Sequence, residues 1–171
     1  MDQDRIIQEV LSALNKRPVE LTKRLNYLEN AEYAAMNYYG NLVNTNQYVT
    51  VPATTIRKLV LREGPMRGFT FGDSSLICNK SGLYLLNCFI NVKASVSAEF
   101  SFYPQSSVFV AGDFGLLHLY ANPNAQQYSS CLPIELEEDD EIILNIGTGG
   151  TGISFVIYAV ALTLTRMDDI S

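Results

Sequence analysis

The feature that most constrains the fold of this chain is an apolar run near its end, residues 153–165 (ISFVIYAVALTLT). Read as a strand, this run is apolar on both faces: Phe155, Ile157, Ala159 and Ala161 on one, and Val156, Tyr158, Val160, Leu162 and Leu164 on the other. A strand of an antiparallel sheet usually buries one face and exposes the other. Something must therefore cover the second face, either helices packed on a parallel sheet or a second copy of the chain.

Upstream of this run, from residue 55 onward, the sequence has the period-two pattern of short strands separated by Gly, Pro, Asn and Asp. The expected strands are 56–62, 67–71, 74–79, 82–94, 97–103, 107–111, 115–120, 127–136, 141–147 and 153–165. No interval between them offers a helix of the length that parallel crossovers require. The pattern therefore predicts a mainly β protein, an antiparallel jelly-roll β-sandwich, and it favours a second copy as the cover for the second apolar face.

The first forty residues have a different pattern, an apolar heptad repeat over residues 3–42 that is typical of a coiled coil. Its core positions include Ile7, Leu11, Leu14, Leu21, Leu25 and Leu28. Because Pro18 interrupts a continuous helix, we expect two helices, 3–15 and 18–39. The repeat leaves two alternatives: α-helices that trimerise or dock the chain, or a helix pair packed on its own domain.

The expected organisation has three parts: an N-terminal α-helical, coiled-coil-like oligomerisation or docking region at 1–42, a linker or arm with the first strand at 43–64, and a jelly-roll head at 65–171. The formal net charge of −6 argues against nucleic acid and against an anionic membrane surface as partners. We expect neither a signal peptide nor a membrane-spanning segment. The odd number of widely spaced cysteines (Cys78, Cys88, Cys131) indicates no disulfide framework and folding in a reducing host cytoplasm.

Several motifs in the β region resemble the complement-globular-head and tumour-necrosis-factor-like (TNF-like) jelly-roll family. Residues 82–92 (GLYLLNCFINV) resemble its Gly-x-Tyr signature, and residues 98–103 resemble the strand that follows. Residues 132–146 are similar to its hairpin, with Asp139 where the family has Gly. The Gly-rich loop and the strand at 153–165 match the terminal strand that lines the family's three-fold axis.

This resemblance covers residues 65–167 and implies a homotrimer whose outer loops bind a partner. The trimer interface is expected to include Tyr84, Phe155, Val156, Ile157, Tyr158, Val160 and Leu162. A charge on one face of strand 153–165 is then expected to dissociate the subunits, and a charge on the other face to unfold them. The candidate ligand-facing loop is polar and aromatic, with Tyr120, Asn122, Asn124, Gln127 and Tyr128.

Catalytic chemistry has little support in the sequence. His118 is the only histidine, and the one enzymatic arrangement available is a thiol dyad with Cys131 or Cys88. The acidic run 135–141 matches no calcium-loop spacing, and the Gly-rich loop 147–152 lacks the Lys-Ser/Thr ending of a phosphate loop. We therefore expect no cofactor and no metal.

Together these observations predict a non-enzymatic, homotrimeric structural or attachment protein at a virion surface: a phage fibre, decoration or adaptor protein. The expected partners are further copies of the chain, a protein that docks the N-terminal helices, and a host-surface protein or glycan. A binding head on a bacterial spore or cell surface is an alternative reading. A cytosolic thiol enzyme that uses Cys131 and His118 is a second alternative.

Overall fold

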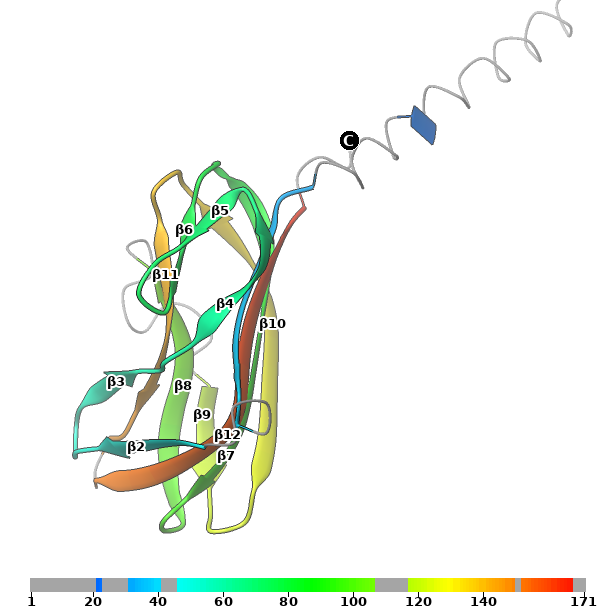
Figure 1. Ribbon diagram of the computed structural model, residues 1–171. Coiled ribbons are helices and arrows are strands. Elements are labelled where there is room, and N and C mark those ends of the chain that lie inside the picture. The colour runs from blue at the N-terminus through cyan, green and yellow to red at the C-terminus, as the bar shows by residue number, and fades with distance from the viewer. Residues whose placement is uncertain (1–20, 23–30, 41–45, 107–116, 150–151, 168–171) are drawn as a thin grey trace, which may run out of the picture. The chain divides into compact units, whose positions relative to one another are not determined.

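In the computed structural model the strands form two facing antiparallel sheets (Figure 1). The structure describes residues 21–22, 31–40, 46–106, 117–149 and 152–167, and for residues 117, 118 and 121 it describes the backbone alone. All described strands belong to one unit, residues 32–167. Within the part of the chain that is described, no helix has the length and apolar character needed to cross a membrane.

The first sheet, here called sheet A, has the strand order β10-β7-β12-β1-β4, and β2 also pairs with β12. Its strands are β1 (Tyr33–Tyr39), β2 (Gln47–Val51), β4 (Arg62–Arg67), β7 (Gly82–Ala94), β10 (Gln126–Leu136) and β12 (Ile153–Arg166). The long strand β12 lies at its centre, with β7 on one side and both β1 and β2 on the other.

The second sheet, sheet B, has the order β5-β6-β11-β8-β9, and β3 also pairs with β11. Its strands are β3 (Ile56–Lys58), β5 (Phe69–Phe71), β6 (Ser75–Cys78), β8 (Ala98–Ser106), β9 (Leu117–Ala121) and β11 (Glu141–Gly147). The segment from β2 to β3 carries the chain from sheet A to sheet B. The predicted antiparallel β-sandwich is therefore confirmed, whereas the expected strand 107–111 lies outside the described residues.

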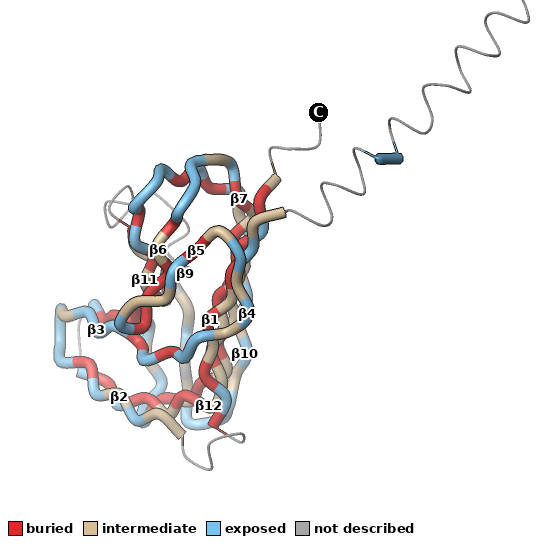
Figure 2. The backbone as a smooth tube through the Cα atoms, turned by 45° about the horizontal axis from the view of Figure 1, so that its top comes forward, coloured by how far each residue is buried: buried red, intermediate tan, exposed pale blue. Residues whose placement is uncertain are grey.

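The core lies between the two sheets and is built from alternate residues of each strand, as the alternating colours in Figure 2 show. Strand β7 is the clearest case, because every second residue from Tyr84 to Ala94 is buried. Contacts between aromatic rings join the layers: the ring centroids of Phe100 on β8 and Phe155 on β12 lie 5.3 Å apart. Burial of these large apolar side chains is the main stabilising contribution to the sandwich.

Strand β1 corrects the predicted helix at 18–39. Residues 33–39 pair with β12 over their whole length, from Tyr33 opposite Thr165 to Tyr39 opposite Ala159. Alternate side chains point into the core, so strand pairing and burial outweigh the helical propensity of this Ala- and Met-containing segment. The compact unit consequently begins at Glu32, and the predicted linker at 43–64 contains β2, β3 and the start of β4.

The predicted helical region is otherwise outside the described residues. Of the proposed helical assembly positions, Ile7, Leu11, Leu14, Leu25 and Leu28 are not described. Leu21 is described, is helical, and is 66% exposed. The coiled-coil prediction therefore stays a prediction.

Glu32, at the start of the compact unit, binds Arg166 near its end. Its carboxylate accepts from Lys80 Nζ at 3.0 Å and lies 3.4 Å from an Arg166 guanidinium nitrogen, while its backbone oxygen accepts from the Arg166 N–H. Gly68 packs against it with φ +76°, and a Cβ at Gly68 would lie 2.3 Å from Glu32 Cγ, so glycine is required there. Partial burial raises the pKa of Glu32, but the hydrogen bonds and positive charges around it outweigh that effect and lower the pKa overall.

Candidate functional site

A β-bulge in β12 changes how its apolar side chains are distributed. Ile157 pairs with Val92 of β7, but the next pair is Ala159 with Asn91, so Tyr158 is an extra residue in β12. The inserted residue reverses the phase of the strand. Ile157 and Val160 therefore both point into the core, and Ala159 does not. The two apolar faces read from strict alternation are combined by the bulge into one strongly apolar core face.

Burial within the subunit corrects most of the predicted trimer interface. Five of its seven residues are at most 1% exposed inside the subunit's own core, where they cannot contact another copy: Tyr84, Phe155, Ile157, Val160 and Leu162. Val156 and Tyr158 are partly exposed on the other side of sheet A. They remain candidates for an interface.

The side of sheet A that points away from the core, here called the outer face, is unusually poor in charge. Across the three central strands β7, β12 and β1 its side chains are apolar or neutral, except for Lys93. Tyrosines gather on it: Tyr39 on β1, Tyr48 on β2, which pairs with Val156, and Tyr158, whose ring centroid is 6.0 Å from Lys93 Nζ. Tyr48 is 76% exposed. A nearly uncharged, aromatic sheet face on a chain with net charge −6 is typical of a protein–protein contact surface.

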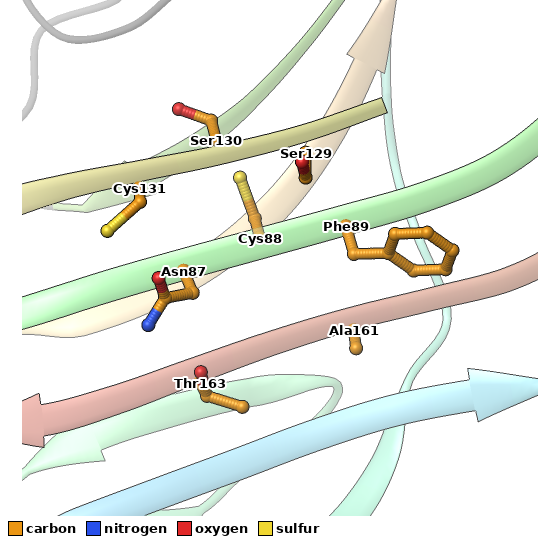
Figure 3. Close-up of a pocket in the computed structure, with 8 residues that line it drawn as sticks. All are labelled: Asn87, Cys88, Phe89, Ser129, Ser130, Cys131, Ala161 and Thr163. Atoms are coloured by element: carbon orange, nitrogen blue, oxygen red, sulfur yellow. The ribbon is translucent and has the colours of Figure 1, made fainter. Parts of the chain in front are cut away.

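A shallow hollow of about 380 Å³ lies on this outer face, across β10, β7 and β12 (Figure 3). It is lined by Asn87, Cys88, Phe89, Ser129, Ser130, Cys131, Ala161 and Thr163. None of these side chains is a carboxylate, an imidazole or an ammonium group, so the hollow offers no charged group to an ion. Close by, the side-chain oxygen of Asn91 is buried and has no hydrogen-bond partner among the described residues.

The three cysteines lie in different environments. Cys131 is exposed at the hollow, whereas Cys78 and Cys88 are buried. Burial raises the pKa of the Cys88 thiol to about 11, and burial also raises the pKa of Cys78. Only Cys131 therefore has the access that thiol chemistry needs.

The proposed thiol dyad gains no support from these positions. His118 belongs to β9 and pairs with Ser101 in sheet B, whereas Cys131 belongs to β10 and pairs with Asn87 in sheet A. The side chain of His118 lies outside the described set. Among the residues that the structure describes, no group of three or more His, Cys, Asp or Glu side chains is placed to hold a metal ion.

The acidic turn between β10 and β11 has a structural role of its own. The buried Asp140 side chain accepts the Glu137 N–H at 2.8 Å, and Asp139 has φ +71°. Asp139 therefore takes the left-handed conformation that Gly provides in the related hairpin motif.

In the predicted ligand-facing loop, Tyr128 is held against the protein by a hydrogen bond and a ring contact. The Tyr128 hydroxyl donates to the Tyr120 carbonyl oxygen at 2.8 Å, and its ring stacks edge-on against Phe100 at 5.9 Å. The Asn124 N–H donates to Asn122 Oδ1, which closes a tight turn. Tyr120 is 57% exposed, and Gln127 points away from the core. The structure thus brings the five residues together at one end of β9 and β10, and Tyr120 is the one that presents a large surface to solvent.

The seven predicted interface residues did not include four residues of the outer face: Phe89, Ala161, Tyr39 and Tyr48. The sequence marked Phe89 as an apolar interruption in the polar face of strand 82–94, and it placed Ala161 on one of the two apolar faces of strand 153–165. Tyr39 and Tyr48 were hidden, because they fell in a predicted helix and a predicted linker. No local signal marks Tyr158 as the bulged residue.

Two antiparallel sheets packed face to face around one core, with most strands pairing across the sequence rather than with their neighbours, define the jelly-roll class of β-sandwich. By sequence, no family model and no curated protein matches the chain. By structure, it is similar to Eiger TNF from S. frugiperda (TM-score 0.55, 15% identity, covering 81% of this chain and 94% of that one). It is also similar to murine APRIL (TM-score 0.52, 12% identity, 79% and 99% covered).

A third similar structure is the vertex protein P5 of PRD1, with a TM-score of 0.51 and 13% identity over 80% of this chain and 97% of that one. The chain therefore has the TNF-like jelly-roll fold, as its sequence motifs indicated.

Proposed function

We propose that this protein is a non-enzymatic, self-associating structural or attachment protein of a virus particle, built as a homotrimer. The observation that carries the proposal is the nearly uncharged outer face of sheet A, which leaves aromatic and small side chains uncovered in a single copy. A second copy is the occupant that fits best, because the face is broad and neutral. Within it, Val156, Tyr158, Phe89 and Ala161 are the proposed contact residues.

The virion-surface location rests on the likeness to the vertex protein P5 of PRD1. In this proposal the region before Glu32 docks the protein to the particle through a protein partner. The head faces outward, and the exposed Tyr120 belongs to the surface that meets a host protein or glycan. Antibodies against the head are expected to label intact particles, whereas labelling of a bacterial spore or cell surface alone would support the alternative location.

Self-association is tested by analytical ultracentrifugation of the full chain at micromolar concentration, where a trimer is expected and a clean monomer would overturn the proposal. A matched pair of variants locates the interface. Ala161→Asp adds a charge to the outer face of sheet A, and Ser101→Asp adds one to a similarly half-buried outward position on sheet B. Ala161→Asp is expected to give a folded monomer, and Ser101→Asp to keep the trimer. Equal behaviour of the two variants would move the interface elsewhere.

A further inference from the structure

The two edge strands of sheet A carry opposite charges on the outer face. At one edge, Arg67 of β4 pairs with Tyr33 and Arg62 pairs with Asn37, which places both arginines on the outer side of the sheet. At the other edge, Glu135 of β10 pairs with Leu83 and lies on the same side. All three charged residues are exposed in the single copy. The neutral centre of the face is thus bordered by a basic edge and an acidic edge.

Opposite charges at opposite edges suit a contact in which the basic edge of one copy meets the acidic edge of another. A cyclic trimer joins two different patches of neighbouring copies, so it can make this contact three times around the ring. Like charges brought together across an interface are unfavourable and opposite charges set its register. The distribution of charge therefore fits a ring in which each copy offers its basic edge to its neighbour's acidic edge.

The positions of Arg67 and Glu135 along the strand direction, here called their heights, are compatible with this contact. A row of paired residues crosses the sheet from Arg67 through Tyr33, Thr165 and Leu85 to Pro133. Glu135 lies two residues beyond Pro133, roughly 7 Å further along the strand. Rotation about an axis that runs along the strands would preserve height, so the offset along that axis between Arg67 of one copy and Glu135 of the next would also be roughly 7 Å, which an arginine side chain can span.

We propose that an ion pair between Arg67 on β4 of one copy and Glu135 on β10 of the next directs the ring closure of the homotrimer, with Arg62 reinforcing the basic edge. This inference rests on the proposed self-association and adds its direction. The rival reading is that Glu135 only protects an edge strand from pairing with another chain, as charged residues and Pro often do. Protection of an edge strand needs no cationic partner. If that were the only role of Glu135, exchanging the charges of Arg67 and Glu135 would not restore association, whereas an ion pair would be restored.

The test measures the concentration at which trimer dissociates, for the full chain, by analytical ultracentrifugation. Glu135→Lys and Arg67→Glu are each expected to raise that concentration at least tenfold, and the double variant Arg67→Glu/Glu135→Lys is expected to return it to within threefold of wild type. Two controls make the same changes in net charge away from the outer face of sheet A: Glu138→Lys on the β10–β11 turn and Arg57→Glu on β3. Both controls are expected to stay within threefold of wild type.

The outcomes are distinguishable. A wild-type monomer would overturn both the proposed function and this inference. A wild-type trimer that tolerates both single charge reversals, or a double variant that does not recover, would overturn the inference alone. If Arg67→Glu fails to fold, Glu135→Lys paired with Arg62→Glu supplies the same exchange, and the wild-type dissociation concentration must rise with added salt because exposed ion pairs are screened.

Discussion

Deleting one residue from β12 tests the phase change at Tyr158. On one side of the strand, β7 pairs with Ile157 and then with Ala159; on the other, β2 stops at Ile157 and β1 resumes at Ala159. Tyr158 therefore has no register partner in any of these pairings. Its deletion leaves Ile157 and Val160 on the core side with regular alternation between them, so we expect the free energy of unfolding to change by about 1 kcal/mol or less.

Deleting Thr163 instead is the matched control, and the strand has two ways to accommodate it. If the bulge is lost, Val160 and Leu162 leave the core and are replaced there by Ala159 and Ala161. That exchange removes five buried methyl or methylene groups, which at about 0.8 kcal/mol each costs about 4 kcal/mol.

If the bulge is kept, Leu164 moves outward and Thr165 moves into the core. Losing the leucine costs about 1.5–3 kcal/mol, and burying the threonine hydroxyl costs about 1–3 kcal/mol. By either route the loss is at least about 2.5 kcal/mol, a large part of the roughly 5–15 kcal/mol by which a domain is stable.

Urea unfolding followed by circular dichroism gives both free energies. Both variants are compared with wild type at a protein concentration at which all three are monomeric, because Tyr158 is also a proposed contact residue and self-association makes stability depend on concentration. We expect a near-native urea midpoint for the Tyr158 deletion and a much lower midpoint for the Thr163 deletion. Equal losses, or a larger loss for Tyr158, would refute the assignment of Tyr158 as the bulged residue.

Two further predictions concern ionisable groups. Glu32→Gln is expected to cost about 1–3 kcal/mol of stability at pH 7. Because the pKa of Glu32 is lower in the folded state, the wild-type advantage is present above the unfolded pKa of about 4.3 and disappears as the pH falls through the folded pKa. The urea midpoints of the two proteins should therefore converge in acid, and a constant difference at every pH would contradict this. A thiol reagent at pH 8 should label Cys131 in the native protein but Cys78 and Cys88 only after unfolding. Burial limits access to both of these thiols and raises the pKa of Cys88 to about 11. Rapid labelling of all three cysteines in the native protein would contradict the core described above.

Much of the fold could be read from the sequence, because strands such as 82–94 and 141–147 were predicted with the bounds that the structure has. Their alternation of apolar and polar residues is a local signal that survives folding. The hairpin between β10 and β11 was also expected from the motif, and the structure shows that Asp139 takes the positive-φ position of its turn. The candidate contact face was only partly readable. Seven residues were assigned to an interface; Val156 and Tyr158 are partly exposed on the outer face, whereas Tyr84 and Leu162 are buried in the subunit.

The rest was decided by tertiary structure, for two physical reasons. The segment 33–39 continues the heptad pattern that precedes it, so local propensity favours a helix. It forms a strand because it pairs with β12 on one side and with β4 on the other, and both pairings exist only in the folded protein. At Tyr158 one extra residue changes the phase of every later side chain, and the sequence contains nothing that marks where the extra residue falls. The sequence by itself determined that this protein is an antiparallel sandwich with more apolar strand surface than one face accommodates. The pairing of β12 with three neighbouring strands decided which of those side chains form the core and which are left for another molecule.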